Sequence, residues 1–153
     1  MYSVAKAKQI FYFGGDFMSF FDKIAGYGSM DNNIEHQICD YLLDDENVIM
    51  AFTFIRDSIA LTNYGIYTLD VQGLSGNKVE VKFFPGKNIK SISFESASTF
   101  DLDVDIKISV DGNTAINQNG IPYNAPISFK VPKKQAEEAK EIVKLVKKHY
   151  LSR

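Results

Sequence analysis

Five basic residues give this sequence its best candidate for binding chemistry. Four lysines lie around the Pro85-Gly86 turn and its two flanking segments, and one arginine precedes them. Ammonium and guanidinium groups that gather on one surface bind phosphates and acidic lipid head groups. The candidate ligand-binding residues are Arg56, Lys78, Lys82, Lys87 and Lys90. The alternative is ordinary edge-strand lysine that blocks unwanted strand pairing, and Glu80 and Glu95 dilute the positive charge.

Three alternating aspartates suggest a metal site only at first sight. Asp101, Asp103 and Asp105 match the first half of a calcium-binding loop. Such a loop needs glycine at its sixth position and an acid at its twelfth, where this chain has Ile106 and Gly112. We therefore interpret the aspartates as the solvated face of a strand and expect no metal.

Catalytic chemistry has little support in the sequence. Cys39 follows His36 by three residues, which would place both side chains on one side of a helix. No third group orients them, and a lone cysteine equally fits a small core position. The chain shows no nucleophile elbow, phosphate-binding loop or dinucleotide fingerprint. We expect a protein that is not an enzyme and holds no cofactor.

Composition places the chain among single-domain globular proteins. It has 153 residues, 45% of them hydrophobic, with 12 Phe and 8 Tyr that supply bulky packing. A formal net charge of −2 gives no overall positive field, so no nucleic acid partner is expected. A single cysteine suits a reducing compartment, and neither a secretory leader nor a membrane-spanning run is present. The expected location is cytoplasmic.

Two helical patterns form a predicted N-terminal extension, residues 1–42. Asp16 fits an N-cap, and apolar residues then recur at helical spacing. This stripe is the candidate interface: Phe17, Phe20, Phe21 and Ile24. It must pack on the rest of the domain or on another subunit, because a membrane-surface helix would carry more basic residues than Lys23. A second helix is predicted from near Asp31, with one face made by Ile34, Ile38, Tyr41 and Leu42.

Alternating hydrophobicity predicts about seven antiparallel strands after residue 46. The segments are 48–54, 59–61, 66–71, 79–84, 89–94, 102–110 and 127–131. The cleanest is 102–110, with one apolar and one polar face, as in an antiparallel sheet. Arg56-Asp57-Ser58 interrupts the alternation and is interpreted as a structural corner, although it could also face a neighbouring subunit. Residues 114–126 are rich in Asn, Gly and Pro and are predicted to form a loop.

A C-terminal helix is predicted from Pro132 to about Tyr150. Proline suits a first helical position, and acidic residues lie early and lysines late, which complements the helix dipole. Its apolar stripe is Ala136, Ala139, Val143, Val146 and Tyr150, flanked by Ile142 and Leu145. Curling the strands into a barrel removes most exposed sheet edges, and this helix would close one end. The expected class is mainly β (α+β).

Three motifs in the expected order resemble the bacterial pleckstrin-homology (PH) domain family. Residues 54–63 read FIRDSIALTN, residues 72–80 read QGLSGNKVE, and residues 98–103 read STFDLD. The resemblance covers residues 42 to 150 and implies a PH-like barrel capped by a helix, here residues 43–153. It also implies homo-oligomers, including rings, but no established ligand. Asn63-Tyr64-Gly65 departs from the family, because a more basic turn is common there.

Two functional hypotheses follow. The leading one is a non-catalytic interaction module that self-assembles and presents a surface to a protein partner. The alternative is a binder of an anionic ligand, phosphate or acidic lipid head group, through the basic residues. The N-terminal extension and the 114–126 loop are individual to this chain, so we expect them to set its partner or its assembly.

Overall fold

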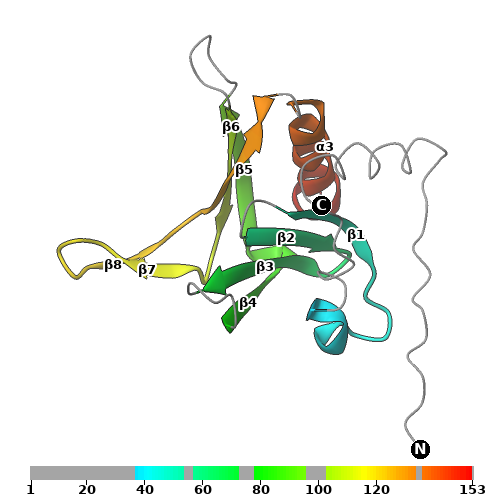
Figure 1. Cartoon of the computed structure of the whole chain (residues 1–153), viewed down its shortest axis with the longest axis horizontal. Helices are drawn as coiled ribbons and strands as arrows, with labels where there is room; N and C mark the ends of the chain where they lie inside the picture. Colours follow the sequence, from blue (N-terminus) through cyan, green and yellow to red (C-terminus); the bar gives the residue numbers. More distant parts are fainter. Residues whose placement is uncertain (1–36, 54–56, 73–77, 96–102, 134–135, 153) are drawn as a thin grey trace, which may run out of the picture.

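The computed structural model describes residues 37–53, 57–72, 78–95, 103–133 and 136–152 (Figure 1). Their strands are β1 (Val48–Thr53), β2 (Asp57–Thr62), β3 (Gly65–Gln72), β4 (Lys78–Pro85), β5 (Ile89–Glu95), β6 (Asp103–Val110), β7 (Thr114–Ile116), β8 (Pro122–Asn124) and β9 (Ile127–Pro132). Their helical segments are η1 (Cys39–Tyr41), η2 (Gly86–Asn88), α3 (Ala136–Val146) and η4 (Lys147–Leu151).

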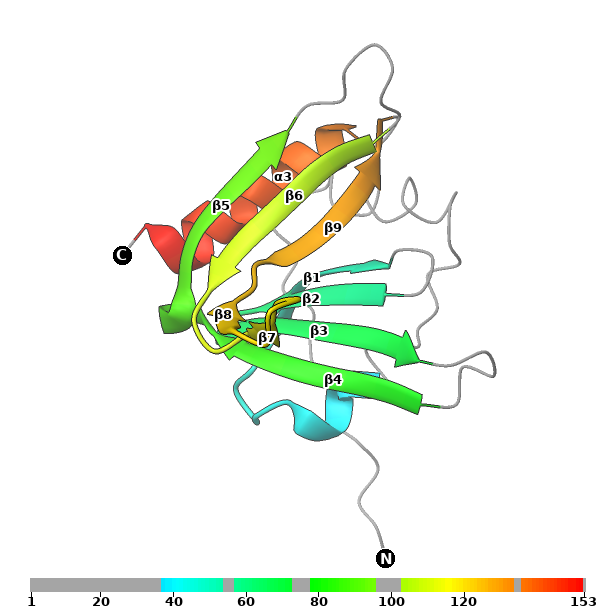
Figure 2. The ribbon, with the colours of Figure 1, turned by 90° about the vertical axis from the view of Figure 1, so that its left-hand side faces the viewer.

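Two antiparallel sheets and one helix enclose the core. The first sheet has the order β1-β2-β3-β4 and the second has the order β5-β6-β9. Figure 2 shows the two sheets crossing, with α3 lying behind β5, β6 and β9, which it contacts. The core side chains are Met50, Phe52, Ile59, Leu61, Ile66 and Phe84 from the first sheet, Ile89, Val104, Ile106, Ile108, Val110, Ile127 and Val131 from the second, and Ala139, Ile142, Val146 and Tyr150 from the C-terminal helix. The predicted barrel of antiparallel strands capped by a C-terminal helix is confirmed.

Strand β6 shows why these residues form a sheet with one dry face. Val104, Ile106, Ile108 and Val110 are buried, whereas the intervening residues are exposed or half-buried. Side chains alternate across a strand, so the period of two in the sequence puts every second residue against α3 and the first sheet. Transfer of each such side chain from water stabilises the fold by about 1.5–3 kcal/mol.

The C-terminal helix begins later than its sequence predicts. Pro132 is the last residue of β9 and pairs with Asp103, and α3 starts at Ala136. Proline tolerates both settings, because its fixed φ suits a strand end as well as a first helical turn.

Ala139, Val146 and Tyr150 of the predicted stripe are buried in the core, whereas Val143 is only half-buried. Fully buried Ile142, which the sequence pattern places on the flank, takes its place in the core. The last turn, η4, is π-helical and carries buried Tyr150.

A second apolar cluster covers the outer face of the first sheet. Ile38 packs there with Ala60, Tyr67 and Leu69, and Leu42 lies against the cluster. The described end of the predicted second helix is therefore packed on the barrel. Tyr41, which the helical pattern placed on the apolar face, is exposed, because the chain tightens into the 3-10 turn η1.

The segment predicted to be a loop contains a hairpin. Within residues 114–126, strands β7 and β8 pair antiparallel, with Ala115 opposite Tyr123. Gly120 has a φ of 76°, a left-handed conformation that glycine adopts without strain. The two main sheets hold the seven predicted strands, and this hairpin adds two more.

A polar corner holds the end of the chain against the turn between β2 and β3. The Tyr150 hydroxyl shares its one hydrogen between the carbonyl oxygens of Thr62 and Gly65, at 2.6 and 2.7 Å. The Thr62 hydroxyl donates to the buried carboxylate of Glu46 at 2.6 Å and accepts from the Gly65 N–H at 3.1 Å. A Cβ on residue 65 would collide with the Phe84 carbonyl oxygen, so glycine is required for this close approach.

Asn63 extends the corner to the chain before β1. Its side-chain oxygen accepts from the Asn47 N–H at 2.7 Å, and its side-chain nitrogen donates to the Asp45 carbonyl at 3.0 Å. The Thr62-Asn63 pair that carries part of the family resemblance thus has a structural role. It fixes one corner of the barrel by satisfying backbone groups that a turn leaves open.

Replacement of Tyr150 by phenylalanine tests the corner. We expect Tyr150→Phe to lower the free energy of unfolding by about 1–3 kcal/mol, because two buried carbonyl groups lose their donor. Urea denaturation followed by circular dichroism measures this loss. Tyr64→Phe is the matched control, because Tyr64 is an exposed residue of the same turn and its loss should cost under about 1 kcal/mol. Equal losses in the two variants would contradict a special role for Tyr150.

Alkaline pH should weaken the fold through two buried tyrosines. Burial, aided by the nearby Glu46 charge, raises the pKa of Tyr67 to about 12, and burial also raises the pKa of Tyr150. A raised folded-state pKa stabilises the protein fully below the unfolded value of about 10, and this stabilisation is lost as pH rises toward the folded value.

The free energy of unfolding should therefore fall between about pH 10 and pH 12, by up to about 1.4 kcal/mol per pH unit for each tyrosine. Denaturant titrations across this range measure the slope. Tyr67→Phe should make the slope shallower. An unchanged slope in that variant would show that Tyr67 does not contribute to it.

Candidate interaction surfaces

The structure spreads the predicted basic residues instead of gathering them. Lys78 and Lys82 lie on β4 with Glu80 between them, and Lys82 pairs with Glu80 at 3.5 Å. Lys87 lies in η2, at the other end of β4 from Lys78. An eight-residue strand spans about 24 Å, so these two ammonium groups cannot hold one phosphate.

Lys90 is held by its own neighbours at the start of β5. Its ammonium group pairs with Asp111 at 3.1 Å and donates to the Lys87 carbonyl at 3.2 Å. Arg56 lies outside the described residues. Ligand binding by these five residues stays a prediction, and the described geometry supplies no shared pocket for it.

The aspartates and the Cys39–His36 pair are the candidate metal-binding and catalytic residues from the sequence. Asp105 pairs with Lys130 on the neighbouring strand at 3.5 Å, and Asp101 lies outside the described part of the chain. Within the described ranges, no group of three or more His, Cys, Asp or Glu side chains could hold a metal ion. Cys39 is exposed and contacts the Asp40 carboxylate, whereas His36 lies outside the described residues.

Two further predicted features are only partly visible. Asp57 and Ser58 open β2, and Ser58 is paired with Thr53 of β1. Arg56 lies outside the described residues, so the corner stays a prediction. The apolar stripe predicted as an interface falls entirely outside the described residues: Phe17, Phe20, Phe21 and Ile24. Its role stays a prediction.

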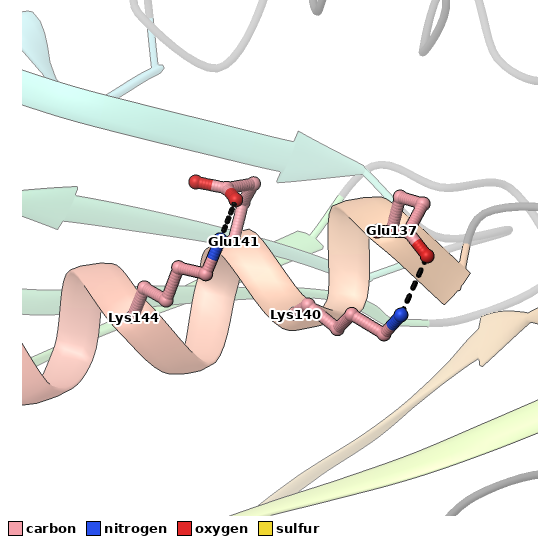
Figure 3. A network of polar contacts seen from close by, with 4 residues as sticks. All are labelled: Glu137, Lys140, Glu141 and Lys144. Carbon is pink, nitrogen blue, oxygen red and sulfur yellow. Dashed lines mark hydrogen bonds and ion pairs between the residues drawn. The ribbon is translucent and has the colours of Figure 1, made fainter.

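The outward face of α3 carries two ion pairs. Lys140 pairs with Glu137 and Lys144 pairs with Glu141, each at 2.6 Å along the same side of the helix (Figure 3). The hydrogen bond from Lys140 lowers the pKa of Glu137, and the hydrogen bond to Glu141 raises the pKa of Lys144. Exposed pairs of this kind contribute little to stability, and they leave this turn of the helix without a net field for an anion.

The free edge of β5 has a different character. β5 ends its sheet, and no described strand pairs with its outer edge. Residues 91–94, called here the β5 edge, carry no charge, and the Phe94 side chain is 51% exposed. The first sheet has two outer strands: β4 carries Lys78, Glu80 and Lys82, whereas β1 carries no charged residue. Charged residues discourage pairing with another chain, so the β5 edge, like β1, lacks this protection.

A projecting hairpin is the second uncharged surface. Residues 113–125, called here the arm, contain β7 and β8 and extend away from both sheets (Figure 1). Ile116, Ile121 and Tyr123 are 70%, 58% and 48% exposed. Asn119-Gly120 between apolar residues is a hairpin signal in the sequence, and it could have revealed the arm.

Within the described part of the chain, no helix is both long enough and apolar enough to span a membrane. The C-terminal helix in particular has regularly placed charged residues on its outer side.

Comparison with known proteins identifies the family. The family model described as "Bacterial PH domain" matches residues 20–149. The uncharacterized protein YjqA of Bacillus subtilis (strain 168) is 35% identical over 97 residues, which cover 62% of this chain and 78% of that protein.

Solved structures share the fold. A DUF1696 family protein with a pleckstrin-homology domain from Shewanella loihica has a TM-score of 0.62 and 24% identity, over 78% of this chain and 92% of that one. A PH domain-containing protein from Exiguobacterium sibiricum has a TM-score of 0.58 and 27% identity, over 79% of this chain and 59% of that one. The match across most of the chain, together with the two sheets and the capping helix, shows that this protein belongs to the bacterial PH domain family.

Proposed function

We propose that this domain is a non-catalytic interaction module that associates with copies of itself and presents the assembled surface to a protein partner. The observation that carries the proposal is the uncharged β5 edge. A strand edge presents a row of backbone N–H and C=O groups that can pair with another chain. Folded proteins usually protect such edges with charges, and β5 has none between Lys90 and Glu95.

Phe94 adds an apolar contact to the backbone groups. It is half-exposed, and burying an aromatic side chain in an interface contributes more than its area alone when it meets another ring or aliphatic chain. Strand addition supplies affinity through main-chain hydrogen bonds and specificity through alternate side chains. The β5 edge offers both.

Binding of an anionic ligand has weaker support. Lys82 and Lys90 are each paired with an acidic side chain, and Lys78 lies a strand length from Lys87. A phosphate site needs several cationic donors that converge on one position. The described lysines do not converge, so the interaction module is the function that we favour.

A charge on the β5 edge tests self-association. We expect Ser91→Lys to raise the dissociation constant of the assembly by about tenfold or more, because the new ammonium group would be desolvated on pairing. Size-exclusion chromatography with light scattering at micromolar concentrations measures the assembly state.

Ser109→Lys is the matched control. Ser109 lies directly opposite Ser91 on the same sheet face, but on the central strand β6. The Ser109→Lys substitution should leave the assembly intact. A wild-type protein that is monomeric at these concentrations would contradict the proposal. Equal effects of Ser91→Lys and Ser109→Lys would also contradict it.

The N-terminal stripe has its own test. Deletion of residues 1–30 removes Phe17, Phe20, Phe21 and Ile24, and we expect it to lower the assembly state. Buried apolar side chains of a short helix supply the free energy of such a contact. Light scattering compares the deletion with Lys23→Ser, which changes a polar position in the same segment and should have no effect. An unchanged assembly after the deletion would assign the stripe to another role.

A further inference from the structure

We infer that Asn119, at the tip of the arm, is a modification site: its side-chain amide is lost spontaneously through a cyclic imide formed with the backbone of Gly120. The reaction needs only water, and it leaves an aspartate or an isoaspartate at position 119. It changes the charge of the arm without an enzyme. It does not depend on the proposed self-association.

The reaction joins two atoms of neighbouring residues. The Gly120 nitrogen gives its proton to a solvent base and attacks the side-chain carbonyl carbon, Cγ, of Asn119. A bond from Cγ to this nitrogen forms, the bond from Cγ to Nδ2 breaks, and Nδ2 leaves with a proton as ammonia. Water then opens the imide ring. Cleavage at Cγ gives aspartate, and cleavage at the main-chain carbonyl carbon gives isoaspartate. Such an intramolecular attack is fast only where the reacting atoms can approach each other.

Gly120 leaves the attacking nitrogen uncovered. A side chain on the residue that follows an asparagine would crowd this nitrogen, and glycine has none. Apart from its chain neighbours, no described atom lies within 4 Å of the position that a Cβ of Gly120 would occupy. Asn119 and Gly120 are both exposed, and the arm projects away from both sheets, so water reaches the site (Figures 1 and 2). They form the single Asn-Gly pair of the sequence.

The hydrogen bonds at the tip leave the Asn119 side chain untied. The Asn117 side-chain oxygen accepts from the Asn119 and Ile121 N–H groups, both at 2.9 Å. These bonds hold the main chain of the tip. Among the described residues, no hydrogen bond engages the Asn119 amide group itself. This group is therefore able to rotate toward the Gly120 nitrogen.

One hydrogen bond restrains the attacking nitrogen. The Gly120 N–H donates to the Asn117 carbonyl at 3.0 Å. This bond closes an exposed turn, and backbone hydrogen bonds at exposed tips open at a small cost in free energy. Each opening frees the nitrogen for attack, so the bond slows the reaction without preventing it.

The arm has three other asparagines that lack this combination. They are Asn113, Asn117 and Asn124. Thr114, Gln118 and Ala125 follow them, so a Cβ lies beside each potential attacking nitrogen. The Asn113 side chain is also held, because it donates to the Ala125 carbonyl at 3.0 Å. The Ala125 N–H, which would have to attack Asn124, donates to the Asn113 carbonyl at 2.7 Å.

An Asp-Gly pair next to the base of the arm is restrained. Asp111 precedes Gly112 and could form the same ring with loss of water instead of ammonia. Its carboxylate pairs with Lys90 at 3.1 Å, and its N–H donates to the Asn88 carbonyl at 2.9 Å. An aspartate held at both its side chain and its main chain turns toward the next nitrogen less readily than Asn119 does.

Loss of the amide changes both the charge and the backbone of the tip. No Asp, Glu, Lys, Arg or His occurs in residues 112–129, so the new carboxylate is the first charge in this stretch. The isoaspartate product also routes the main chain through Cγ and lengthens it at residue 119. The Asn119 and Ile121 N–H groups then no longer both reach the Asn117 oxygen. A partner that buries the uncharged tip would lose affinity for the modified form, because burying a charge costs free energy.

One tryptic peptide tests the assignment. Cleavage after Lys107 and Lys130 releases residues 108–130, which contain every asparagine of the arm. We expect the full chain, incubated folded in mildly alkaline buffer, to gain the mass that replacement of NH2 by OH adds to this peptide. Fragment ions should place the gain at Asn119, at a rate about tenfold or more above that of the other three asparagines. A sample digested without incubation corrects for deamidation during digestion.

The rate at Asn119 should also rise with pH, because the attacking nitrogen must lose its proton. Equal rates at the four asparagines would overturn the inference. A peptide that gains no mass during the incubation would overturn it as well.

Asn119→Gln separates the two glycine-containing pairs. It keeps an exposed amide but requires a larger ring, so we expect it to remove the mass gain. It should also remove most of the methyl label that an isoaspartate methyltransferase adds to the incubated wild type. Asn124→Gln, which changes another exposed amide of the hairpin, is the matched control and should behave like the wild type. Undiminished labelling of Asn119→Gln would assign the isoaspartate to Asp111 and contradict the inference.

Gly120→Asn tests the role of the glycine. Gly120 has a φ of 76°, and asparagine adopts such a left-handed conformation more readily than most other residues. The added side chain would crowd the attacking nitrogen. We expect the rate at Asn119 to fall by about tenfold or more. A rate equal to that of the wild type would show that the glycine does not direct the reaction, and the inference would fail.

Discussion

The hydrogen bonds of Tyr150 are the constraint on which the barrel depends. One hydroxyl group reaches the carbonyl oxygens of Thr62 and Gly65, which precede it by 88 and 85 residues. This contact joins the last turn of the chain to the turn that leads into β3. It also fixes the helix that covers the core, because α3 and η4 are continuous. Glu46 and Asn63 extend the same corner to the segment before β1. The segment that leads into β1 and the last helical turn are therefore held at the same corner.

The described surface has charged parts and uncharged parts. The outer side of α3 and the edge strand β4 carry paired charges, which keep water at those surfaces and oppose contact with another chain. The β5 edge and the arm carry none. A small barrel that closes its core with one helix still has exposed strand edges, and among the described residues the edges of β5, β1 and the arm are uncharged. The proposed interaction role therefore rests on edges and not on a pocket.

Part of the candidate site could be read from residue order. Ser91 to Phe94 is visibly uncharged, and Asn119-Gly120 signals a hairpin. The sequence favoured a loop because residues 114–126 are rich in Asn, Gly and Pro, yet a two-stranded hairpin tolerates Pro122 on its outer side. The lysines, in contrast, suggested a basic cluster that the described structure does not form. Lys78 and Lys87 are close in sequence, but an extended strand separates its ends by its full length.

The sequence by itself determined the period of each element, and hence the alternating strands, the amphipathic final helix and the family to which their motifs belong. These depend on local geometry, in which every second or every third to fourth residue faces one way. Only the tertiary structure decided that Pro132 ends a strand, that Thr62 and Tyr150 meet, and that β5 is left at the edge of its sheet. Those facts depend on which distant segments become neighbours, and burial of the whole core selects that arrangement.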